Sequence, residues 1–133
     1  MIIIVTDNSY ISNAISDIDV VCDAVRLKVV GDPVRMKEYE TAESQASSFK
    51  TAVYMGTVPP YVKSWQDAKG WTAQAACDDI LAASVRWQNA LASIRDLRLK
   101  AKESARKCTT KAAVDAVVAK FKSDLNTLMT GVK

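Results

Sequence analysis

The chain has 133 residues, a formal net charge of +3, 49% hydrophobic residues and 25% charged residues, which fits one soluble globular domain with or without a small appendage and argues against disorder. Glycine and proline are scarce, with four and three copies, which disfavours a turn-rich β-sandwich. Histidine is absent, so the usual general base, the commonest transition-metal ligand and the usual pH switch are all missing.

The first 31 residues are rich in isoleucine and valine, which pack well on a pleated surface. Residues 1–6 predict a strand, and a second strand is predicted near residues 10–16. Alternation of apolar and basic residues over 24–30 predicts a third. A sheet this small is marginal alone, so we expect residues 1–31 to dock on another chain, with Ile2 and Ile4 as candidate contacts.

The apolar run at the start of the chain is too short for a secretory signal and lacks a basic flank. No run reaches the roughly 18 apolar residues that span a bilayer. We therefore expect synthesis and folding in a cytoplasm, without membrane insertion. The three cysteines, Cys22, Cys77 and Cys108, are far apart in sequence, and we expect free structural thiols.

Helical patterns begin after Gly31, where Asp32 can cap a helix and Pro33 suits its first position. A first helix is predicted over residues 33–53, and a proline-stiffened loop follows at residues 56–60. A short helix then begins near residue 60, with Gly70 as its C-cap.

Residues 72–108 predict one long helix, because core-type residues recur at alternating steps of four and three over more than four heptads. The stripe comprises Ala76, Ile80, Ala83, Trp87, Ala90, Ile94, Leu97, Ala101, Ser104 and Cys108. A last helix over residues 111–129 follows a short break, which makes it an antiparallel neighbour. The sequence therefore predicts a mainly α fold, a helical bundle at residues 32–133 preceded by the β-rich segment at 1–31.

Signatures of catalysis and cofactor binding are missing from the sequence. There is no glycine-rich phosphate loop, and no serine has a histidine base. Asp78 and Asp79 are adjacent in a helix and diverge, so we interpret them as acids that favour a helix N-terminus. We expect no enzyme activity, no cofactor and no metal site.

The strongest charge feature is a basic stripe on the long helix, formed by Arg95, Arg98, Lys102 and Arg106 at steps of three and four. Such a stripe can bind the phosphates of nucleic acid. The alternative is a solvated or interface face, because cations favour helix C-termini and their stems cover apolar edges. The low net charge and the lack of interleaved aromatic residues favour this alternative.

Tryptophans and leucines suggest where the helices meet. Trp65 and Trp71 flank Gly70, and we favour a clamp of the short helix onto the long one over a ligand pocket. The long helix is longer than its last-helix partner, which leaves an apolar patch to cover. We expect a homo-oligomer at this patch, with the candidate contacts Ile80, Leu81, Trp87 and Leu91.

Several short segments together resemble the α-helical region of small tail proteins of tailed bacteriophages, found in tail-fibre-associated and tail-fibre-assembly proteins. The resemblance covers roughly residues 34–130 and rests on ESQASSFK at 43–50, GTVP at 56–59, VKSW at 62–65, KGWTAQAA at 69–76, DILA at 79–82, and IRDLRLK at 94–100.

This resemblance implies a non-enzymatic virion component at the tail fibre or tail tip, with other tail proteins as partners and a trimer as the favoured oligomer. Two alternatives stay open. One is a tail-fibre assembly chaperone that leaves before the virion is complete. The other, from a different class, is a small basic helical protein that binds nucleic acid.

Overall fold

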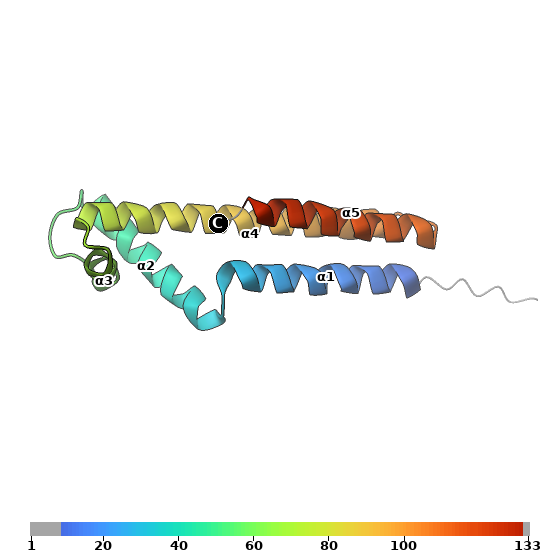
Figure 1. The fold of residues 1–133 in the computed structure, drawn as a ribbon, viewed down its shortest axis with the longest axis horizontal. Coiled ribbons are helices and arrows are strands. Elements are labelled where there is room, and N and C mark those ends of the chain that lie inside the picture. Colours follow the sequence, from blue (N-terminus) through green and yellow to red (C-terminus); the bar gives the residue numbers. More distant parts are fainter. Residues whose placement is uncertain (1–8, 132–133) are drawn as a thin grey trace, which may run out of the picture. The chain divides into compact units, whose positions relative to one another are not determined.

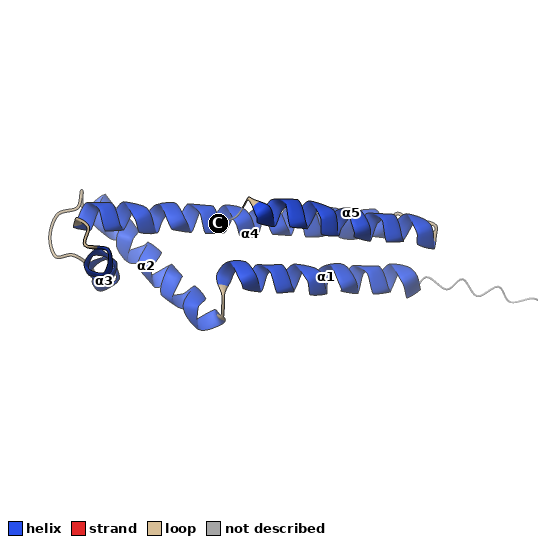
Figure 2. Ribbon diagram, viewed as in Figure 1, coloured by secondary structure: helices blue, strands red, loops and turns tan. Residues whose placement is uncertain are grey.

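The computed structural model describes residues 9–131, which form five helices and no strand (Figures 1 and 2). They are α1 (Ser9–Val30), α2 (Pro33–Thr51), α3 (Pro60–Lys69), α4 (Ala73–Arg106) and α5 (Lys111–Thr130). The prediction of a mainly α fold is confirmed.

The β-rich segment is wrong for residues 10–16 and 24–30, which lie within α1, while the predicted strand at residues 1–6, with Ile2 and Ile4, lies outside the described residues. Ala14, Ile18 and Cys22 are buried at steps of four, which is one face of a helix. Val25 and Val29 are half-buried and Leu27 is exposed, whereas a strand would place all three on one face. The helical burial pattern extends over the 22 residues of α1. The alternation of apolar and basic residues over 24–30 is shorter and does not produce a strand.

The helices divide into two compact units. Residues 9–28 and 90–131 form unit 1, and residues 29–89 form unit 2, so α4 contributes to both. This grouping differs from the expected division into residues 1–31 and 32–133. No described helix has the length and apolar content that crossing a membrane requires.

Unit 1 consists of α1, residues 90–106 of α4, and α5, which lies beside that part of α4 in Figure 1. Its buried apolar side chains come from all three helices: Ala14, Ile18, Cys22, Ala90, Ile94, Ala105, Val114, Phe121 and Leu125. The Lys102 Nζ–Asp19 Oδ2 pair at 3.0 Å ties α1 to α4, and the Lys122 Nζ–Asp17 Oδ2 pair at 3.1 Å ties α1 to α5.

Burial along α4 departs from the strict heptad stripe. Ala90 and Ile94 are buried as predicted, but Ser104 is exposed and its neighbour Ala105 is fully buried. Ala83 is also exposed. A straight helix has about 3.6 residues per turn and drifts by ~20° per heptad relative to a 3.5 repeat. The core position therefore moves forward by one residue between Ile94 and Ala105.

Unit 2 consists of α2, α3 and the N-terminal part of α4. Its centre is one cluster of buried residues, Ala46, Phe49, Val62, Ala76 and Cys77. Six partly buried side chains pack against the cluster: Tyr54, Val58, Trp65, Ala73, Ile80 and Leu81. Because Tyr54 and Val58 of the loop between α2 and α3 pack on this cluster, the cluster fixes that loop as well as the three helices.

Candidate interaction surface

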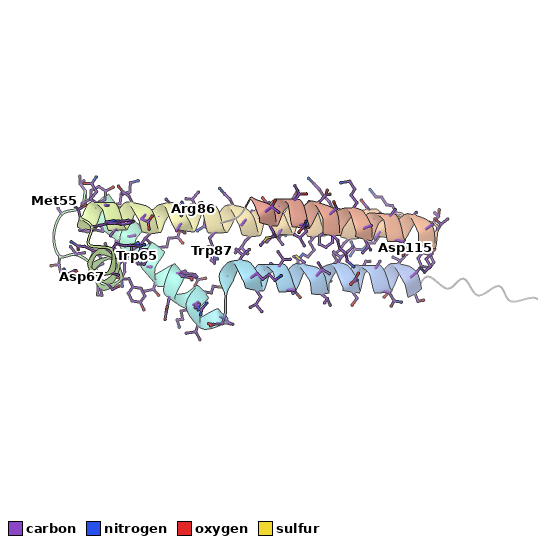
Figure 3. All side chains as sticks on the ribbon, in the orientation of Figure 1. Met55, Trp65, Asp67, Arg86, Trp87 and Asp115 are labelled. Carbon is purple, nitrogen blue, oxygen red and sulfur yellow. The ribbon has the colours of Figure 1, made fainter. Side chains whose placement is uncertain are left out.

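Unit 2 exposes large apolar side chains on the two loops that flank α3 and on the first turn of α3. We call Val53, Met55, Tyr61 and Trp71 the tip surface; they are 72%, 73%, 38% and 40% exposed. Figure 3 shows Met55 on the loop that joins α2 to α3. No residue from 51 to 62 is charged, so this loop offers apolar contact area without a cost of desolvating charge.

Hydrogen bonds from two aromatic side chains to α4 hold the elements that carry the tip surface. The Tyr54 hydroxyl donates to Asp78 Oδ1 at 2.6 Å, and Trp65 Nε1 donates to Asp79 Oδ2 at 2.9 Å. Asp78 and Asp79 thus diverge as predicted from adjacent helical positions, and each accepts a bond from a different element. Their role is to fix the loop and α3 rather than to share a proton.

The carboxylate of Asp78 changes the pKa of the Tyr54 phenol. The hydrogen bond to Asp78, with smaller contributions from desolvation and the negative charge, raises the pKa of Tyr54 to about 12. The ring also meets Phe49 edge-on, with centroids 5.7 Å apart. Sequence reasoning did not single out Tyr54, because its partner lies 24 residues away.

The backbone beside the tip surface adopts an unusual conformation. Val53 and Tyr54 have φ angles of 55° and 59°, in the left-handed region. A β-branched residue there is strained. Backbone hydrogen bonds from Val53 to Lys50 and from Tyr54 to Phe49, both 2.9 Å, keep the chain in this turn. The strained turn presents Val53 to solvent and directs Tyr54 to the core.

The tryptophan clamp is confirmed for Trp65, which packs on the core cluster and bonds to α4. Trp71 instead is partly exposed, and the Lys69 ammonium lies 4.9 Å from the Trp65 ring centroid and 5.6 Å from that of Trp71. The cation therefore bridges the two rings and orients Trp71 at the edge of the tip surface.

The other predicted contact residues occupy different environments. Ile80 and Leu81 are half-buried and pack on the core cluster of their own unit. Trp87, labelled in Figure 3, is half-buried in unit 2, and its indole Nε1 is buried with no hydrogen-bond partner among residues 9–131. Leu91 is half-buried and belongs to unit 1. Their role as contacts to another copy stays a prediction.

Two residues of the basic stripe form ion pairs within unit 1. Lys102 is paired with Asp19 of α1, and Arg106 is paired with Glu103 at 3.3 Å. Arg98 is half-buried and its Nε has no hydrogen-bond partner among residues 9–131, whereas Arg95 is exposed. Two of the four cations are thus neutralised locally, which leaves Arg95 and Arg98 without an ion pair among the described residues.

The other features of the described residues that could form a site are two buried thiols and one open depression. Burial raises the pKa of the Cys22 and Cys77 thiols, which keeps them protonated and unreactive. One open depression follows the exposed face of α2 and is lined by Glu40, Glu43, Ser44, Ser47, Ser48 and Thr51. Within residues 9–131, no group of three or more histidine, cysteine or acidic side chains could hold a metal ion.

Comparison of the chain with protein-family models, curated proteins and solved structures found no match.

Proposed function

We propose that this chain is a non-enzymatic component of a bacteriophage tail, located at the tail fibre or tail tip, that binds other tail proteins through the tip surface. The exposed, uncharged apolar group at Val53, Met55, Tyr61 and Trp71 supports binding to a protein. The tail setting comes from the resemblance over residues 34–130. The expected helical bundle, with its last helix antiparallel to the long one, is part of this proposal.

The rigidity of the tip surface favours its use in binding. Tyr54 and Trp65 are tied to adjacent carboxylates of α4, so the loop and α3 are held before any partner arrives. Pre-organised side chains lose less conformational entropy on association than mobile ones. Exposed aromatic side chains and methionine are also enriched at protein interfaces.

Mass spectrometry of purified particles from a phage that encodes this chain tests the setting. A fixed number of copies per particle supports a structural component. Absence from particles, with retention on the isolated fibre during assembly, supports the chaperone and contradicts our proposal. The pairing of Lys102 and Arg106 within unit 1 argues against nucleic acid as the partner, and salt-sensitive retention on DNA would reverse that argument.

The variant Met55→Glu tests the surface itself, because it places a charge where we expect an apolar contact. Val34→Glu is the matched control: Val34 is 70% exposed against 73% for Met55, and it lies in the first turn of α2, where an acid is tolerated. We expect Met55→Glu to lose incorporation and Val34→Glu to retain it, with both variants folded. Equal incorporation of the two would exclude the tip surface.

A further inference from the structure

The α1 helix carries apolar side chains on the face that its own unit leaves open. Val20 and Leu27 are 64% and 59% exposed, and Ala24 between them is also exposed. They lie on the side of the helix opposite Ile18, which is fully buried. We call Val20, Ala24 and Leu27 the outer face of α1. A helix that carries apolar side chains on two opposite sides is usually covered by other parts of a protein on both of them.

Charge is distributed unevenly along this helix. The acids Asp17, Asp19 and Asp23 precede the bases Arg26 and Lys28. Asp17 and Asp19 form ion pairs within unit 1. Asp23, Arg26 and Lys28 are exposed and form no ion pair among the described residues. The outer face is therefore flanked by an acidic part and a basic part.

We propose that α1 binds α1 of a second copy of this chain in an antiparallel, two-fold symmetric contact centred near Asp23 and Ala24. In this register Val20 faces the partner's Leu27 across the apolar stripe. Asp23, which forms no ion pair among the described residues, lies near the partner's Arg26 on one flank. The two-fold axis repeats each of these pairs.

The charge order selects this arrangement over its competitors. A parallel pair of α1 helices would place acids beside acids and bases beside bases, which is destabilising. An unrelated partner would need to supply both signs in the opposite order, whereas a second copy supplies them by symmetry. The small side chain of Ala24 at the centre allows the two helices to approach closely.

The size of the contact sets the expected affinity. In this register residues 17–30 of the two helices overlap, a contact about 21 Å long and about 10 Å wide, which is roughly a quarter of the ~800 Å² per partner of a standard interface. We therefore expect a weak dimer, with a dissociation constant of roughly 10–100 μM. This contact does not involve the tip surface, so either proposal can fail without the other.

Sedimentation equilibrium of the full chain at about 100 μM tests the dimer. A dimer is expected, and it should weaken at least tenfold in Leu27→Glu. Val85→Glu is the matched control, since Val85 is 57% exposed on α4, and it should dimerise like the wild type. A monomer, a trimer such as the resemblance favours, or a dimer that Leu27→Glu leaves intact would overturn the proposal.

Charge exchange between Asp23 and Arg26 tests the register. Asp23→Arg and Arg26→Asp should each weaken the dimer, because each places like charges together across the two-fold contact. The double variant should restore most of the affinity, since the pair is then reversed rather than removed. Circular dichroism checks that each variant stays helical. A double variant that stays helical but does not recover the affinity of the dimer would refute the antiparallel pairing.

Discussion

Replacing Val53 by glycine should stabilise unit 2, although it removes an apolar side chain. Val53 has a φ angle of 55°, and a left-handed conformation costs an L-residue about 1–2 kcal/mol. Glycine avoids this strain but costs about 0.5–1 kcal/mol through the entropy of the unfolded chain. The side chain is 72% exposed, so little burial is lost. The expected net gain is roughly 0.5–1 kcal/mol.

Tryptophan fluorescence during urea unfolding measures this gain in the relevant unit. All three tryptophans, Trp65, Trp71 and Trp87, belong to unit 2. In thermal unfolding, a gain of this size corresponds to a rise of roughly 2–8 °C in the melting temperature of a unit as small as residues 29–89. The same variant should bind the partner less well, because it removes an apolar contact of the tip surface.

Val85→Gly provides the control for this experiment. Val85 is an exposed valine in the ordinary helical backbone of α4, where glycine destabilises by about 0.5 kcal/mol relative to valine. The two valine-to-glycine changes should therefore have opposite signs. A Val53→Gly variant that is less stable than the wild type would refute the interpretation that the turn is strained.

Further perturbations address the core, the basic stripe and the loop anchor. Ile94→Ala removes a fully buried side chain of unit 1 and should cost about 2–5 kcal/mol in thermal unfolding followed by circular dichroism; a loss below about 1 kcal/mol would contradict the burial. Lys102→Met breaks the pair with Asp19 and should cost about 0.5–1 kcal/mol, more than Lys100→Met, whose exposed pair with Asp96 is worth less. In a spectroscopic titration Tyr54 should ionise near its pKa of about 12. This folded-state pKa lies above the unfolded value of about 10. The contribution of Tyr54 to the stability of the folded state is therefore complete at pH values below about 10. It is lost as the pH rises through the folded-state pKa. Ionisation of Tyr54 near its ordinary pKa of about 10 would contradict the bond to Asp78.

Local capping signals in the sequence mark the starts of α2, α4 and α5 and the end of α3. Asp32 caps α2 through a bond from the Arg35 N–H, and Thr110 caps α5 through a bond from the Ala113 N–H. Thr72, at the start of α4, accepts from the Ala75 N–H, and Gly70 ends α3 in the left-handed conformation. These features depend on neighbours within four residues, so the sequence alone suffices to predict them.

The remaining features depend on contacts between distant residues. Valine and isoleucine favour strands locally, so the prediction of strands at residues 10–16 and 24–30 is wrong, whereas the burial pattern of α1 becomes clear only over the whole helix. Asp19 and Lys102 are 83 residues apart. The sequence therefore does not predict their ion pair, which neutralises part of the basic stripe. Val53 and Met55 are of residue types that are usually buried in a protein core, and only the fold shows that they are exposed.

Competitive incorporation tests the central claim, that the chain binds a tail partner through its tip surface, most directly. Wild-type chain and Met55→Glu are expressed together, and quantitative mass spectrometry compares their ratio in purified particles with their ratio in the cell. We expect strong depletion of Met55→Glu from particles and no depletion of Val34→Glu in a parallel experiment. An unchanged ratio for Met55→Glu would contradict binding through the tip surface.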